Sequence, residues 1–314
     1  MPIEDLTYRT YDGPLVLRSW RWWIIAVARL RYLRTRWWFW ALVCCSLLPY
    51  FVVGIILYVQ NTLGGQAPSG PQDLFFDQTQ GQKFANLFRQ AMDWQGLWLF
   101  LIAVVVGAGS IALDNRTNAL QVYLSKPLTK RDYLVGKWMG IFLAVYGVAL
   151  APAVVFYLYC LLNYTGQGFL RDEPWLILRV LVAAAAPAAI HASLLVGISA
   201  WSRTPLLAGA AYAGLFFVTA IISTMVWGIA TNGRLNRGQT IQRLSIGGTI
   251  GALQQNALGV TVHVTQVHRR RGSVQRLSIK PPDLAVFLPL AAGLCMLGVA
   301  AARVRIRAVE VVQG

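Results

Sequence analysis

The sequence predicts an all-α membrane protein with six transmembrane helices, an N-terminal amphipathic helix in the membrane interface and a short cytoplasmic helix between spans two and three. Hydrophobic residues make up 56% and charged residues only 13% of the 314 residues, whereas soluble domains carry about 25% charged residues. The apolar residues come in blocks of about 20, the length that a helix needs to cross a bilayer core of about 30 Å. Such blocks are too long and too unbroken for the alternating strands of an outer-membrane barrel.

Six spans follow from these blocks, at 38–59, 94–113, 138–162, 175–200, 206–229 and 284–302. Four spans begin with a tryptophan, an amphipathic side chain that prefers the headgroup level of the membrane: Trp38, Trp94, Trp138 and Trp175. The four cysteines also lie within apolar blocks, where we expect small hydrophobic residues rather than metal ligands or disulfide partners: Cys44, Cys45, Cys160 and Cys295.

Basic residues indicate which ends of the spans face the cytoplasm. They are frequent before the first span, between residues 114 and 137 and in the tail, and sparse in the loops at 60–93 and 163–174. By the positive-inside bias, we expect both termini in the cytoplasm and the protein in the cytoplasmic (inner) cell membrane. Arginines at 269–271 in the loop 230–283 run against this bias, but long loops cross largely regardless of charge. The net charge of +16 then reflects membrane orientation, not nucleic-acid binding.

The expected division of the chain is a cytoplasmic segment 1–37, a six-span domain 38–302 and a cytoplasmic tail 303–314. Within the first segment, helical spacing places arginines on one face and aromatic residues on the opposite face. Such a helix lies in the interface, with basic residues towards anionic headgroups and tryptophans in the acyl boundary. The membrane-interface residues so predicted are Arg18, Arg21, Arg29, Arg36, Trp20 and Trp38. The alternative is a basic, disordered anchor.

Motifs of catalysis are missing from the sequence. There is no GxxxxGK[ST] phosphate loop, no HExxH, no GxSxG and no CxxC pair. His191 lies within the fourth span, and we expect a neutral imidazole bonded to a neighbouring helix rather than a proton relay. We therefore expect no catalytic residue, no cofactor and no metal in this chain.

The most informative segment is cytoplasmic and runs from residue 114 to residue 137. Asp114 and Asn115 are suited to end the second span and to cap a helix directly after it. Residues 117–125 are expected to form a short helix in which Leu120, Tyr123 and Leu124 cluster, and Pro127 ends it. Thr129 then caps the next helix. Such a helix fits either docking against a partner or lying on the membrane as an elbow.

This segment resembles the signature of permeases of the type-2 ABC exporter family. That signature has an acidic and a basic residue after the second span, a segment rich in Leu and Tyr, and a Ser-Lys-Pro-Leu run that continues to Gly-Lys. The matching residues are Asp114, Arg116, Leu120, Leu124, Ser125, Lys126, Pro127, Leu128, Asp132, Tyr133, Gly136 and Lys137.

The resemblance implies that the segment is a coupling helix seated in a groove of an ABC ATPase (nucleotide-binding) subunit. The ATPase-docking residues that it implies are Asp114, Arg116, Leu120, Tyr123, Leu124, Pro127, Asp132 and Tyr133. A second permease copy or paralogue and two ATPase subunits would complete the transporter.

The resemblance therefore implies a permease subunit of an ABC exporter, with ATP hydrolysis in a separate chain, and the missing catalytic motifs agree with a non-catalytic subunit. Two alternatives stay open. One is a membrane scaffold that recruits a cytoplasmic ATPase without transport, and the other is a membrane-embedded lipid-modifying enzyme.

Overall fold

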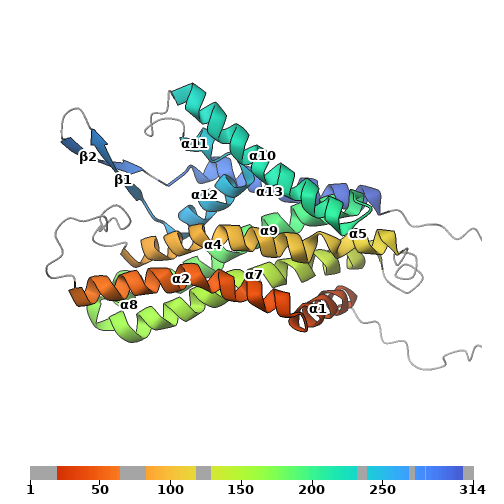
Figure 1. The fold of residues 1–314 in the computed structure, drawn as a ribbon, viewed down its shortest axis with the longest axis horizontal. Helices are drawn as coiled ribbons and strands as arrows, with labels where there is room; N and C mark the ends of the chain where they lie inside the picture. Colours follow the sequence, from red (N-terminus) through yellow and green to blue (C-terminus); the bar gives the residue numbers. More distant parts are fainter. Residues whose placement is uncertain are drawn as a thin grey trace, which may run out of the picture.

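The computed structural model describes residues 20–63, 83–117, 129–231, 239–268, 273–279 and 281–306, and Figure 1 shows their arrangement. The longer helices are α1 (Arg21–Arg34), α2 (Trp37–Leu63), α4 (Lys83–Gly107), α5 (Gly109–Arg116), α7 (Lys130–Tyr164), α9 (Leu176–Trp201), α10 (Pro205–Thr231), α12 (Ile246–Leu258) and α13 (Leu284–Arg305). Shorter elements are η1 (Thr165–Gln167), α8 (Phe169–Asp172), α11 (Gln239–Gln242), β1 (Val262–His268) and β2 (Ser273–Ile279).

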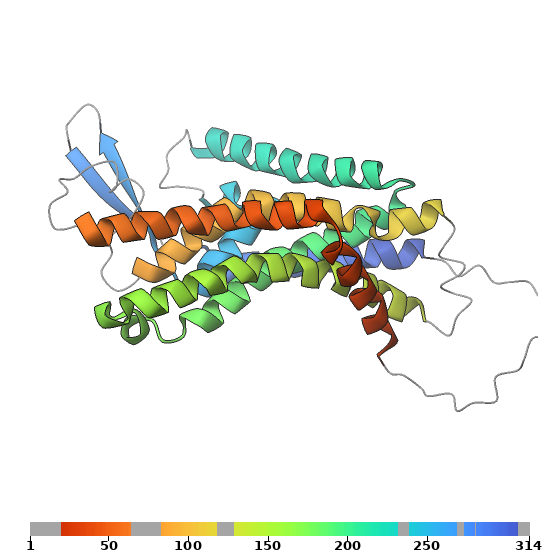
Figure 2. The ribbon, with the colours of Figure 1, turned by 60° about the horizontal axis from the view of Figure 1, so that its bottom comes forward.

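The six predicted spans are confirmed. Six helical stretches of the described residues are long and apolar enough to cross a membrane: Trp37–Val59, Phe84–Arg116, Lys130–Tyr164, Leu176–Trp201, Pro205–Ala230 and Leu284–Arg305. They run lengthwise beside one another, with α1 at one end of the bundle and the β1–β2 hairpin at the other (Figure 1). Figure 2 shows that α1 leaves the line of α2 at a steep angle, which suits a helix in the interface followed by a span.

Two of the spans are longer than the sequence analysis expects. The second was expected from residue 94, but α4 begins at Lys83, and its first turns bury Phe84 and Phe88 in the bundle. The third was expected from residue 138, but α7 begins at Lys130, capped by Thr129 as predicted. Both helices therefore reach beyond their most apolar stretch.

The fourth span, α9, lies at the centre of the bundle and packs tightly against α13. A Cβ atom added at Gly197 would lie 2.6 Å from the carbonyl oxygen of Gly298, so only glycine allows this approach. Gly107 of α4 lies against Leu195 of α9 in the same way. In contrast, α10 keeps most of its surface exposed, with Leu206 at 82%. The first span and the last two thus expose most of their apolar surface, whereas the fourth span is largely buried.

The connection between the last two spans holds a helix and a hairpin. Helix α12 packs against α9, α13 and α4 at the end of the bundle remote from α1 (Figure 1). The antiparallel hairpin comes next, with a register from Val262↔Ile279 to His268↔Ser273. The sequence analysis expects no strand here, because short runs of mixed polarity in a long loop predict little. Residues 269–272, including the arginines at 269–271, lie outside the described residues.

Candidate functional site

The coupling segment, residues 114–137, is described at both of its ends. Asp114 and Arg116 lie at the end of α5, and Asp132 and Tyr133 lie in the first turn of α7. The other predicted docking residues, Leu120, Tyr123, Leu124 and Pro127, lie outside the described residues. What the structure adds is the arrangement of the two ends.

The start of α7 is set by a capping box. The Thr129 hydroxyl accepts a hydrogen bond from the Asp132 amide at 3.1 Å, and the Asp132 carboxylate accepts one from the Thr129 amide at 3.3 Å. This exchange satisfies amides that the first turn of a helix leaves unpaired. It fixes where α7 begins and so which face carries Tyr133.

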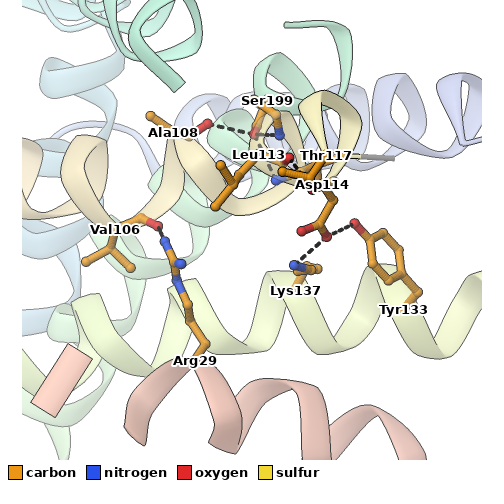
Figure 3. A network of polar contacts seen from close by, with 11 residues as sticks. Arg29, Val106, Ala108, Leu113, Asp114, Thr117, Tyr133, Lys137 and Ser199 are labelled. Carbon is orange, nitrogen blue, oxygen red and sulfur yellow. Dashed lines mark hydrogen bonds and ion pairs between the residues drawn. The ribbon is translucent and has the colours of Figure 1, made fainter. Parts of the chain in front are cut away.

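Three side chains join the two ends of the coupling segment. The Tyr133 hydroxyl donates to Asp114 Oδ2 at 2.6 Å, and Lys137 Nζ lies 2.7 Å from the same oxygen (Figure 3). Tyr133 and Lys137 are four residues apart on α7, so they share one face of that helix. We call Asp114, Tyr133 and Lys137 the clamp.

The clamp is buried at the end of the bundle that carries α1. The side chains of Lys137 and Asp114 are only 14% and 12% exposed, and the Tyr133 side chain is fully buried. Removing two charges from water is costly, and mutual attraction offsets that cost only when further hydrogen bonds satisfy the pair. The hydroxyl of Tyr133 supplies such a bond. The clamp therefore favours one arrangement of α5 against α7 rather than adding much stability by itself.

Helix α5 is in turn fastened to α9 through Ser199. The Ser199 hydroxyl accepts hydrogen bonds from the amides of Ile111 and Ala112 at 3.0 and 2.9 Å, and donates to the carbonyl of Ala108 at 2.8 Å. It lies where the helical path is interrupted between α4 and α5 (Figure 3). Asn115 adds a hydrogen bond to the carbonyl of Ala200 at 3.1 Å. A displacement of α5 would consequently act on α9, the central helix.

Helix α1 packs directly beside the clamp. A Cβ atom at Gly136 would lie 2.7 Å from the carbonyl oxygen of Trp22 and 2.8 Å from Ile25 Cβ, so glycine is required at this crossing. One helical turn further along α7, Gly140 faces Arg29. Small residues on α7 therefore seat α1.

The prediction for Arg29 is wrong. Its guanidinium does not face headgroups but donates to the carbonyl of Val106 in α4 (Figure 3). Burial lowers the pKa of Arg29, and the nearby carboxylate of Asp114 opposes that shift. Arg36 lies over the ring of Tyr32 at 4.6 Å and is exposed. Trp20 is exposed, Trp38 and Arg21 are partly exposed, and Arg18 lies outside the described residues.

Sequence reasoning missed Arg29 and Ser199 as parts of this site. A single polar residue near the end of an apolar span is a signal for Ser199, because such residues hydrogen-bond across helices. His191 carries the same signal, and its predicted bond to a neighbouring helix is confirmed: its Nδ1 pairs with the hydroxyl of Tyr212 in α10.

A family described as ABC-2 family transporter protein matches residues 23–275. No curated protein matches the chain. Because the matched region takes in five of the six spans and the whole clamp, the chain belongs to the ABC-2 transporter family and is a permease subunit of an ABC transporter.

Proposed function

We propose that this chain is one permease subunit of an exporter, driven by a separate ABC ATPase subunit that docks on the coupling segment. The observation that carries the proposal is the clamp. Asp114, just before the segment's central part, is bonded to Tyr133 and Lys137, just after it. The clamp ties the two ends of the segment together, so a displacement of one end acts on the other.

The contacts around the clamp can transmit a displacement of the segment to three helices of the bundle. Tyr133 and Lys137 belong to α7, so a displacement acts directly on the third span. Asp114 belongs to α5, which Ser199 fastens to α9. Packing at Gly136 brings α1 along with α7. Movement of the segment would therefore tilt several spans together, the kind of motion that alternates access to the two sides.

The anchors that we propose for the ATPase are Leu120, Tyr123 and Leu124. A few apolar or aromatic anchors carry most of the binding free energy of a protein interface, each about 2 kcal/mol or more when central. Asp132 completes the capping box of α7, and the proposed role of Asp114, Arg116 and Pro127 is to set where the docking helix starts and ends. From the distribution of basic residues, we propose that both termini and this segment lie in the cytoplasm.

A second copy or paralogue of this chain is part of the proposal. Its support is the exposed apolar surface along α10 and α13. Only 22% of the most apolar stretch of α10 is buried, and only 17% of that of α13. Catalysis is assigned to the partner, so the purified chain alone should hydrolyse no ATP.

The test is co-purification of the ATPase with a tagged permease. Replacing Tyr123 and Leu124 by alanine should release the ATPase or abolish permease-dependent hydrolysis, while membrane insertion stays normal. A matched control is Tyr58→Ala with Ile55→Ala, two exposed residues of α2 outside the coupling segment. Full ATPase binding and hydrolysis by the Tyr123, Leu124 variant would refute the docking site. If the unaltered chain binds the ATPase but supports no transport, the scaffold alternative is favoured.

A further inference from the structure

An apolar groove lies between α2 and α7, in the half of the bundle remote from the clamp. Its volume is about 490 Å³, within the range of about 300–1,000 Å³ typical of sites that enclose a small molecule. It is lined by residues 47–58 of α2 and 152–159 of α7, none of them charged. These stretches are the later halves of two membrane spans.

The groove has a buried aromatic floor and exposed walls. Tyr50 and Phe156 form the floor, with ring centres 6.0 Å apart, and both are buried. Phe51 and Val155, on opposite walls, are 67% and 62% exposed. The groove therefore opens sideways from the bundle, towards the bilayer and not towards an aqueous path.

The polar atoms at the floor are turned away from the groove. The Tyr50 hydroxyl points to Gln95 Oε1 at 3.5 Å, and Gln95 donates to the carbonyl of Val148 at 3.1 Å. A polar or charged occupant would lose its hydrogen bonds to water without gaining others, which costs free energy for each group so buried. The chemistry of the lining selects a hydrocarbon.

The shape selects a flexible hydrocarbon rather than a helix. Helices that pack closely in membranes meet at small residues, but the rim of this groove is built from large side chains, Leu47, Phe51, Ile55 and Val155. The small residue in the lining is Gly54, and a Cβ atom added there would lie 3.7 Å from the ring of Phe156. Tyr58 and Tyr159 lie towards the far ends of the two spans, where tyrosine prefers the headgroup level.

We propose that this groove holds one acyl chain of a membrane phospholipid from the leaflet remote from α1. The chain lies against the Tyr50–Phe156 floor, and its headgroup lies near Tyr58 and Tyr159. Because lipid tails surround the protein anyway, burial from water contributes nothing to retention. The chain is held by dispersion contacts with a concave aromatic surface, which a flat helix surface does not offer.

The test uses the full chain in phosphatidylcholine vesicles that contain a small fraction of phosphatidylcholine with a diazirine on one acyl chain. After photolysis, mass spectrometry of peptides maps the adducts. We expect adducts to concentrate on residues 47–58 and 152–159, well above the density on the exposed surface of α10, which serves as an internal reference. Gly54→Phe should lower the groove adducts to the α10 level, because the new side chain fills the groove. Gly147→Phe, on α7 where an added Cβ meets nothing within 4 Å, should leave them unchanged.

Adducts spread evenly over the lipid-facing surface, or unaffected by Gly54→Phe, would overturn the proposal. So would disulfide formation between copies carrying Phe51→Cys and Val155→Cys, because a protein would then occupy the groove. If Gly54→Phe does not fold, Val155→Trp fills the groove from the opposite wall. The readout needs no ATPase, so its failure leaves the proposed coupling untouched.

Discussion

A single carboxylate decides the arrangement of the candidate site. Asp114 is buried and accepts from Tyr133 while facing Lys137, and Arg29 lies close enough to feel its charge. Sequence alone predicts that Asp114, Tyr133 and Lys137 belong to one signature. It does not predict that Asp114 touches the other two, because they lie 19 and 23 positions after it on another helix.

Removing that charge should be far more damaging than removing the hydroxyl beside it. Asp114→Asn removes the charge that pairs with the buried Lys137, and breaking a buried ion pair from one side is expected to cost about 3–5 kcal/mol in stability. Tyr133→Phe removes one hydrogen bond to a charged group, a loss of about 1.5–3 kcal/mol. Thermal unfolding midpoints of the purified proteins would rank the two variants.

The double variant Asp114→Leu, Lys137→Met is the control for this series. Replacing a buried ion pair by apolar residues is often close to neutral, so it should recover most of the Asp114→Asn loss. Equal midpoints for wild type and Asp114→Asn would mean that the ion pair does not form.

Glu173 offers a second test at the residue scale. One carboxylate oxygen accepts from the amide of Ala85 at 3.2 Å, and the other is buried with no hydrogen-bond partner among the described residues. Burial raises the pKa of Glu173, although the Ala85 bond and Arg179 oppose the shift. The carboxyl group of Glu173 thus binds its proton more tightly in the folded state than in the unfolded chain.

The pH dependence follows from that direction. Below the unfolded pKa, Glu173 is protonated in both states and does not lower the free energy of unfolding. The free energy of unfolding falls as pH rises from the unfolded pKa to the raised folded pKa. Glu173→Gln should flatten this decline in the unfolding midpoint, because the amide has no charge to bury. Asp172→Asn, at an exposed neighbour whose charge adds to the raised pKa of Glu173, should reduce the slope less than Glu173→Gln does. An unchanged slope in Glu173→Gln would contradict the assignment.

At the scale of helices, the spans are predictable because a long apolar block in lipid must pair its own backbone groups, which a helix does. The ends of the spans are less predictable: α4 starts at Lys83, and its first turns bury Phe84 and Phe88 against the rest of the bundle. The inward turn of Arg29 also escapes prediction, because its regular spacing with Arg18, Arg21 and Arg36 is that of a headgroup-facing stripe. Only the packing of α1 on α7 shows that this position faces the bundle.

The seat of α1 can be tested at Gly136. Gly136→Val would push a side chain into the backbone of Trp22, and overpacking of this kind costs about 1–3 kcal/mol. We expect the distance between spin labels on α1 and α7 to increase and to broaden. Gly147→Val, on the same helix in open space, should leave that distance unchanged. A wild-type distance distribution in Gly136→Val would show that α1 does not pack here.

For the whole molecule, the clamp joins the coupling segment to a bundle that is well packed at its centre and exposed on its first and last two spans. The α9–α13 crossing at Gly197 and Gly298 supplies a stiff centre, and Ser199 links it to α5. Such an arrangement suits a subunit that receives force at one end and shares its outer spans with lipid or a partner.

The most direct test of this coupling is photocrosslinking from within the segment. A benzoylphenylalanine in place of Tyr123 should crosslink to an ATP-hydrolysing subunit in intact membranes. The same residue in place of Tyr58, at the end of the bundle remote from α1, should not. Crosslinks from position 123 to lipid alone would contradict the proposed coupling, as would the same partner captured from both positions.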